Sequence, residues 1–207
     1  MSRRIAVLRP EPENAVTAAR IAALGRTALR LPLFAVAPVA WDVPDPRRYD
    51  SLLLTSANAL RHAGAGLAAL RSLPVHAVGA ATAVAARAAG FDVVAVGSGG
   101  VDALDPPGRI LRLAGREHRP LAGADTIVVY ASDALAPDLS PLVGSIAMIH
   151  SPRAGQALAG RMADRSRVDI VAISAAAAAA AGPGWRSVAV ADRPTDDAII
   201  AATLSLG

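Results

Sequence analysis

The chain contains no cysteine and no lysine, and all 21 of its fixed basic residues are arginine. Without cysteine, disulfides, thiolate nucleophiles and cysteine-ligated metal centres are excluded. Without lysine, Schiff-base chemistry and lysine-containing phosphate loops are excluded as well. Arginine remains charged and can hold a carboxylate or a phosphate through two parallel hydrogen bonds.

Aromatic and charged residues are also scarce, at 3% and 18% of 207 residues, whereas 53% are hydrophobic. This composition predicts a folded globule with a core of alanine, valine, leucine and isoleucine. The net charge of +4 mildly favours an anionic partner. No dense basic run or basic recognition helix is present, so we expect no nucleic-acid partner.

Long hydrophobic runs are absent too. Residues 170–185 carry no charge, but this run is shorter than the ~20 residues that span a bilayer, and it ends in Gly-Pro-Gly. The N-terminal “MSRRIAVLRP” has no continuous apolar stretch after its basic residues, so we expect no signal peptide there. We expect a soluble, cytoplasmic protein that does not contact a membrane.

Short apolar runs alternate with alanine-rich stretches. Strands are expected at residues 4–8, 51–56, 75–79 and 92–97, and helices at 13–25 and 81–90, each of which ends in glycine. This alternation predicts βαβ units and parallel sheets.

The two halves of the chain resemble each other at an offset of about 95 residues. The matching pairs are “LLTSANAL” from Leu53 with “MIHSPRAGQ” from Met148, “HAVGAATAVAA” from His76 with “VAISAAAAAAA” from Val171, and, at a different offset, “RIAVLRPEPENA” from Arg4 with “RILRLAGREHRP” from Arg109. Single matches arise by chance in such a composition, but matches in this order predict an internal duplication. The seven alanines 175–181 are then the second copy of the helix at 81–90, with Ser174 as a candidate N-cap.

Ligands of parallel sheets bind at the carboxyl ends of the strands, where helix N-termini attract anions. Four strand-to-helix turns are predicted: “TSAN” (55–58), “VGAAT” (78–82), “HSPRA” (150–154) and “ISAAA” (173–177). Their small residues would let a ligand approach the backbone amides, although small residues also simply permit tight turns and close helix packing. The substrate-binding positions expected in these turns are Thr55, Ser56, Asn58, Gly79, Ala80, Ala81, Ser151, Arg153, Ser174, Ala175 and Ala176.

Conventional catalytic sets are not recognisable. The histidines His62, His76, His118 and His150 show no metal-ligand spacing, and His150 precedes Ser151 without a third triad member. The glycine-rich “GSGG” (97–100), which leads into “VDAL” as the start of a helix, weakly suggests a nucleotide-binding regulatory module. The amides, hydroxyls and arginines that remain suit an enzyme that orients a reactive substrate, or equally a non-catalytic binding protein.

Five motifs, in this order and over essentially the whole chain, resemble the uroporphyrinogen-III synthase family. They are “LLLTSANAL”, “AVGAATAVAARAAGFDV”, “IVVYAS”, “HSPRAG” and “VADRPTDDAIIAA”. No single motif is specific, but their order, the duplication and the total length together are. The resemblance implies an α/β fold with two flavodoxin-like parallel-sheet domains joined by a two-strand linker. The expected domains are residues 1–35 with 134–207, and residues 38–130, with linkers at 36–37 and 131–133.

The resemblance also implies a hydro-lyase that needs no metal or organic cofactor. Members of the family cyclise hydroxymethylbilane with loss of water and inversion of ring D, which gives uroporphyrinogen III. This substrate is a polycarboxylate, in agreement with a site of amides and arginines. We expect a monomer that receives its substrate from hydroxymethylbilane synthase. The alternative is a non-catalytic two-domain binding protein for an anionic small molecule.

The resemblance also assigns roles to individual residues. Tyr130 matches the family tyrosine proposed to assist loss of the hydroxyl, and Thr82 matches a threonine of the site, so both are candidate catalytic residues. The remaining matches are Arg9, the basic residue after the first strand, and the hydroxyl positions Ser56, Ser151 and Thr195. Two departures stand out: Ala177 replaces a hydroxyl that many members keep, and residues 114–125 are short for the expected helix.

Overall fold

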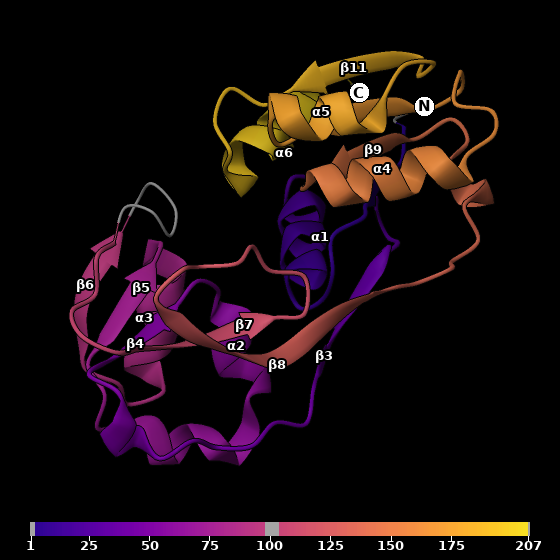
Figure 1. Cartoon of the computed structure of the whole chain (residues 1–207). Coiled ribbons are helices and arrows are strands. Elements are labelled where there is room, and N and C mark those ends of the chain that lie inside the picture. The colour runs from indigo at the N-terminus through magenta and orange to yellow at the C-terminus, as the bar shows by residue number, and fades with distance from the viewer. Residues whose placement is uncertain (1–2, 98–103, 207) are drawn as a thin grey trace. The chain divides into compact units, whose positions relative to one another are not determined.

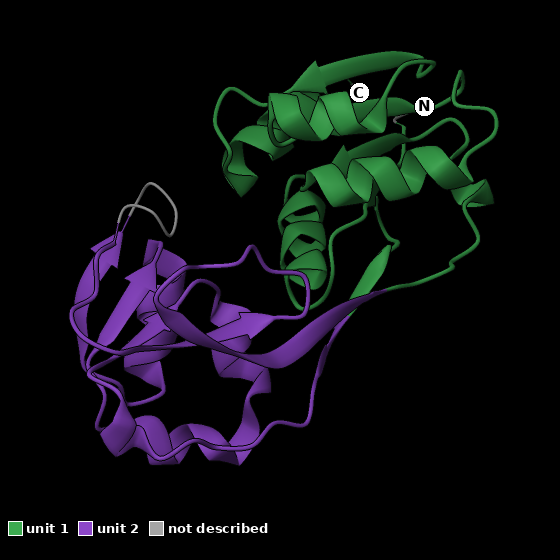
Figure 2. Ribbon diagram, viewed as in Figure 1, with its two compact units in different colours: residues 1–35, 134–207 green, residues 36–133 purple. Residues whose placement is uncertain are grey.

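The computed structural model describes residues 3–97 and 104–206. The chain divides into two compact units (Figure 2). Unit 1 comprises Met1–Ala35 and Ala134–Gly207, and unit 2 comprises Val36–Asp133. The expected helix at “VDAL” falls largely on residues 98–103, which lie outside the described ranges.

Unit 1 contains a five-stranded sheet in the order β11-β10-β9-β1-β2 (Figure 1). Its strands are β1 (Ile5–Val7), β2 (Ala28–Arg30), β9 (Ile146–Ile149), β10 (Asp169–Ala172) and β11 (Ser187–Val190). Its helices are α1 (Glu13–Ala23), α4 (Pro152–Arg161), α5 (Ala175–Ala181) and α6 (Asp196–Ser205), with a 3-10 turn at Ser140–Leu142. All neighbouring strands are parallel. Two separate hydrophobic cores include residues of β1, β9 and β10, which explains why these strands are apolar without alternation.

Unit 2 contains a six-stranded sheet in the order β3-β8-β7-β4-β5-β6. Its strands are β3 (Phe34–Pro38), β4 (Ser51–Leu54), β5 (Val75–Val78), β6 (Val93–Gly97), β7 (Ile110–Gly115) and β8 (Ala124–Ala134). Its helices are α2 (Ala57–His62) and α3 (Ala80–Ala88), with 3-10 segments at Pro46–Arg48 and Gly64–Leu70. The pairs from β8 through β6 are parallel.

Strands β3 and β8 carry the chain across the boundary between the units. Within unit 1, the Leu135 N–H donates to the Leu33 carbonyl over 2.9 Å, and within unit 2 the Val39 N–H donates to the Val129 carbonyl over 3.0 Å. Leu33 pairs with Leu135, and the later residue Val39 pairs with the earlier residue Val129, so the two strands run antiparallel. Residues 36–37 and 131–133 are part of this paired ribbon.

The two sheets repeat one strand order. Unit 1 reads β11-β10-β9-β1-β2, and unit 2 reads β6-β5-β4-β7-β8 before β3 is added. Strand β9 begins 95 residues after β4 (Ile146 and Ser51), and α5 begins 95 residues after α3 (Ala175 and Ala80). The predicted α/β fold with an internal duplication is therefore confirmed. Numbered within unit 1 alone, the order is 2-1-3-4-5, the doubly wound order of flavodoxin.

The copies differ between their first two equivalent strands. In unit 1, α1 joins β1 to β2, whereas in unit 2 residues 116–123, all of them described, join β7 to β8 without a helix. This loop covers Arg112 of β7, whose side chain donates to the Arg119 carbonyl over 2.7 Å. The short segment noted in the sequence is thus a loop in place of a helix, and the Arg112 side chain holds this loop through its hydrogen bond to Arg119.

The polyalanine segment forms α5. Ser174 is its N-cap, because the Ser174 hydroxyl accepts from the Ala177 N–H over 3.3 Å. Ala177 is fully buried, whereas Ala175 and Ala176 are exposed. Within the described residues, no helix is long and apolar enough to cross a bilayer.

Candidate active site

Polar residues of unit 1 gather at the carboxyl ends of four strands. Arg9 follows β1, Ser151 follows β9, Ser174 follows β10, and Thr195 lies between β11 and α6. Because all these strands are parallel, their carboxyl ends share one edge of the sheet. The predicted unit 1 positions are therefore brought to one edge.

The three hydroxyls at this edge have the same local role. Ser151 accepts from the Ala154 N–H over 3.1 Å, and Thr195 accepts from the Ala198 N–H over 3.3 Å, as Ser174 does in α5. Each side chain therefore satisfies one free amide at a helix N-terminus. A hydroxyl that accepts such a bond still has its own proton to donate.

Asp196, in the first turn of α6, collects donors from distant segments. Its Oδ1 accepts from Arg9 Nη1 over 3.0 Å and from Thr17 Oγ1 over 2.9 Å, and its Oδ2 accepts from Arg20 Nη1 over 2.7 Å. His150 Nε2 lies 3.3 Å from the same Oδ1. One carboxylate thus ties together the β1 end, α1, the β9 end and α6.

His150 in this network is buried, with 7% of its side chain exposed. Burial, together with the positive charge of Arg9, lowers the pKa of His150 to about 4, although Asp196 acts in the opposite direction. The imidazole is therefore neutral at physiological pH. Its Nε2 can then donate to Asp196, and its buried Nδ1 has no partner among the described residues.

The carboxyl ends of β4 and β5 carry the predicted turns of unit 2. Thr55 and Ser56 follow β4, and the Ser56 hydroxyl caps α2 by accepting from the Asn58 N–H over 3.2 Å. Gly79 follows β5 with φ +85°, a conformation that side chains rarely adopt. Its turn leads directly into α3, where Thr82 is only 5% exposed.

Tyr130 lies in β8 beside the carboxyl end of β7. It pairs with Gly115 after a register shift, and a Cβ added at Gly115 would lie 2.6 Å from the Tyr130 ring. The ring centroids of Tyr130 and His62 are 6.2 Å apart. Gly115 therefore leaves room for the Tyr130 ring. Tyr130 lies at the same end of the sheet as Ser56 and Thr82, where the parallel strands have their carboxyl ends.

The structure places the predicted site residues in two groups, one in each unit. The unit 1 group is Arg9, Ser151, Arg153, Ser174, Ala175, Ala176 and Thr195. The unit 2 group is Thr55, Ser56, Asn58, Gly79, Ala80, Ala81, Thr82 and Tyr130. The guanidinium of Arg153 lies over the Phe34 ring, 4.3 Å from its centre, in a cation–π contact.

Sequence reasoning missed Asp196 and Thr17. It also left His150 without a carboxylate partner, because the partner lies 46 residues away. The only available signal was the position of Asp196 directly after Thr195 in the motif “VADRPTDDAIIAA”. Within residues 3–97 and 104–206, no three histidine or carboxylate side chains gather as a possible metal site.

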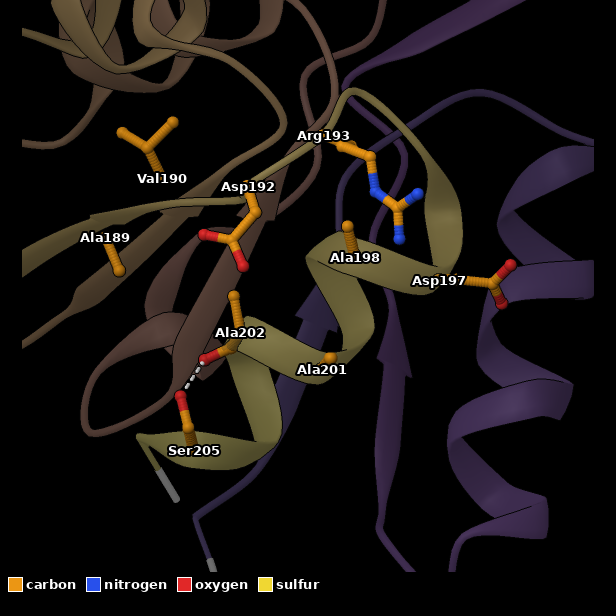
Figure 3. Close-up of a pocket in the computed structure, with 9 residues that line it drawn as sticks. All are labelled: Ala189, Val190, Asp192, Arg193, Asp197, Ala198, Ala201, Ala202 and Ser205. Atoms are coloured by element: carbon orange, nitrogen blue, oxygen red, sulfur yellow. Dashed lines mark hydrogen bonds between the residues drawn. The ribbon is translucent and has the colours of Figure 1, made fainter.

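A pocket of about 580 Å³ lies between β11 and α6 (Figure 3). It is lined by Ala189, Val190, Asp192, Arg193, Asp197, Ala198, Ala201, Ala202 and Ser205. None of the predicted site residues lines it, and neither does Asp196. The predicted site residues thus lie at the strand ends, outside this pocket, whose lining combines alanines with Asp192, Arg193, Asp197 and Ser205.

The sequence and the fold both resemble known proteins. The family model described as “Uroporphyrinogen-III synthase HemD” matches residues 15–201. No curated protein matches the chain. The fold is similar to uroporphyrinogen-III synthetase from Helicobacter pylori (TM-score 0.71, 18% identity, 100% of both chains). It is also similar to a mutant uroporphyrinogen III synthase from Thermus thermophilus (TM-score 0.57, 20% identity, 99% of both chains). Because the family model covers nearly the whole sequence, the chain belongs to the uroporphyrinogen-III synthase family, hydro-lyases of tetrapyrrole biosynthesis.

Proposed function

We propose that this enzyme converts hydroxymethylbilane into uroporphyrinogen III, with loss of water, inversion of ring D and closure of the macrocycle. The observation that carries this proposal is the family match over residues 15–201. The repeated strand order and the polar strand ends of both units are consistent with it.

The substrate loses its hydroxyl readily, so the protein has mainly to orient the chain and to stabilise charge. Tyr130 is the proposed proton donor to the departing hydroxyl. Its support is its position in β8 beside the carboxyl end of β7, where Gly115 leaves space for the ring. Thr82 is the second proposed catalytic group, at the start of α3.

The proposed substrate-binding groups act on the carboxylates of the substrate. Ser151, Ser174 and Thr195 accept from helix amides and retain a proton for a carboxylate. Arg9 supplies positive charge at the same edge. In unit 2, the turns at 55–58 and 79–81 offer backbone amides and the Ser56 hydroxyl.

We also propose that the enzyme is a cytoplasmic monomer that takes hydroxymethylbilane from hydroxymethylbilane synthase. The support for this handover is chemical. Free hydroxymethylbilane closes without an enzyme to the type I isomer, so prompt capture preserves the substrate for the type III product.

The decisive experiment incubates purified protein with freshly generated hydroxymethylbilane and resolves the uroporphyrin isomers after oxidation. No cofactor is added, and a parallel reaction contains a chelator. We expect the type III isomer to predominate in both reactions, against type I in a protein-free control. Type I alone would refute the proposal and would favour the non-catalytic anion-binding alternative.

A further inference from the structure

Arg9 is held at both ends, its backbone by Asn14 and its guanidinium by Thr17 and Asp196. The Asn14 side chain is fully buried and donates to the carbonyls of Val7 and Arg9 over 2.8 and 2.7 Å, which fixes the backbone at Arg9. The guanidinium is held separately, because Arg9 Nη1 donates to Thr17 Oγ1 over 3.3 Å and to Asp196 Oδ1 over 3.0 Å. A long side chain that is otherwise free to rotate is thereby confined.

This arrangement uses only one of the three guanidinium nitrogens. Within the described part of the chain, Arg9 Nε and Nη2 donate to no acceptor, and the side chain is 25% exposed. Neither nitrogen is among the buried polar atoms that lack a partner, so both reach the surface. Nε and Nη2 form one edge of the planar guanidinium, and such an edge matches the two oxygens of a carboxylate.

The negative charge of Asp196 is shared between Arg9 and Arg20, so it does not fully neutralise the positive charge of Arg9. Asp196 shares its charge with Arg20, which also pairs with Asp197, and His150 is neutral where it meets Asp196. Thr17 is fully buried and bridges the guanidinium and the carboxylate. The network therefore holds Arg9 in place and leaves it a cation with an available edge.

We propose that Asp196 is a positioning residue that holds Arg9, through Nη1 and Thr17, so that the Nε and Nη2 edge binds one carboxylate of the substrate. This inference rests on the proposed function. Asp196 itself does not touch the substrate. Its effect is on binding, because a confined arginine loses less freedom when it pairs with a carboxylate.

The chain offers a matched control one residue away. Asp197 lies in the same helical turn and has the same charge, but it is 83% exposed, and among the described residues it pairs with Arg20 alone. Asp196→Asn and Asp197→Asn therefore change the net charge equally, while only Asp196→Asn disturbs Arg9. We expect Asp196→Asn to raise KM about tenfold with kcat within about twofold, the pattern of lost uniform binding. Asp197→Asn should leave both constants within about twofold.

A double-mutant cycle separates action through Arg9 from a direct or purely structural effect. Arg9→Gln should raise KM to a similar extent, and Asp196→Asn should add little in the Arg9→Gln background. Equal behaviour of Asp196→Asn and Asp197→Asn would overturn the proposal. So would a full additional effect of Asp196→Asn when Arg9 is already replaced. If Asp196→Asn melts below the assay temperature, Thr17→Val replaces it in the cycle, with the same expectation at smaller amplitude.

Binding of uroporphyrin III, followed by its fluorescence, provides a readout that does not require turnover. If uroporphyrin III binds more weakly to the Asp196 and Arg9 variants than to the wild type, but the wild type forms no type III isomer, the proposed function is refuted and this inference is supported. If the wild type forms the type III isomer and the Asp196 variant binds uroporphyrin III as tightly as the wild type, this inference is refuted and the proposed function is supported.

Discussion

Gly155 of α4 packs directly against the backbone of Ala177 in α5. A Cβ carbon added at Gly155 would lie 2.7 Å from the Ala177 carbonyl oxygen and 3.0 Å from the Ala181 nitrogen. Ala177 and Ala181 are fully buried. The run of alanines is thus partly explained, because these two positions of α5 lie where a neighbouring helix approaches too closely for larger side chains.

Gly155→Ala should lower the free energy of unfolding by about 1–3 kcal/mol, since the added methyl group meets backbone atoms that cannot move aside. Gly160→Ala is the matched control in the same helix, where an added Cβ has no neighbour within 4 Å. It should instead stabilise the protein by about 0.5–1 kcal/mol. Urea unfolding of both variants measures the difference, and equal stabilities would show that α4 and α5 do not pack this closely.

His150 should make stability depend on pH. Burial and the charge of Arg9 lower its pKa from 6.5 to about 4 in the folded protein. A lowered pKa means that the unfolded chain binds the proton more readily. The contribution is therefore complete above pH 6.5 and is lost as pH falls towards 4, by about 3 kcal/mol in total.

His150→Gln keeps an amide donor for Asp196 and removes the titration. Its unfolding free energy should change less between pH 7 and pH 4.5 than that of the wild type. The pKa of His76 is also lowered by burial, so part of the slope should remain. Identical slopes in the two proteins would mean that His150 does not titrate as its surroundings indicate.

Tyr130→Phe should reduce kcat by about 100-fold, the lower end of what a general acid contributes. The ring can remain over Gly115, so the melting temperature should stay close to that of the wild type. Tyr49→Phe is the matched control, because Tyr49 is the only other tyrosine, and it lies beside Arg109. Single-turnover formation of the type III isomer measures the effect. A Tyr130→Phe enzyme within twofold of the wild type would remove the phenol from catalysis.

Ala176→Asp tests whether the turn before α5 contacts substrate. Ala176 is exposed, and an acidic residue in the first turn favours a helix, so the melting temperature should not fall. A substrate carboxylate would be repelled, which should raise KM about fivefold, equivalent to about 1 kcal/mol for two charges roughly 4 Å apart in water. Ala176→Asn has a similar shape without the charge and should behave like the wild type. An unchanged KM in the Asp variant would place α5 outside the binding surface.

Local features were readable from the sequence because they depend on residues only a few positions apart. The apolar runs at 4–8 and 51–56 contain β1, which is one residue shorter at each end, and β4, which begins at Ser51 as expected and ends two residues earlier. Ser174 was recognisable as an N-cap from its place between an apolar run and a helix former. The order of matching segments in the two halves anticipated the repeated sheet, because one sequence pattern folds into one strand order.

Only the tertiary structure decided which distant groups meet. His150 and Asp196 are separated by 46 residues, and their contact depends on how α6 docks beside the ends of β1 and β9. The same docking commits one nitrogen of Arg9 to Asp196 and leaves the other two without an acceptor among the described residues. Periodicity and capping act along the chain and so can be read from it, whereas the partners of a partly buried carboxylate such as Asp196 depend on side-chain packing between elements that no local pattern specifies.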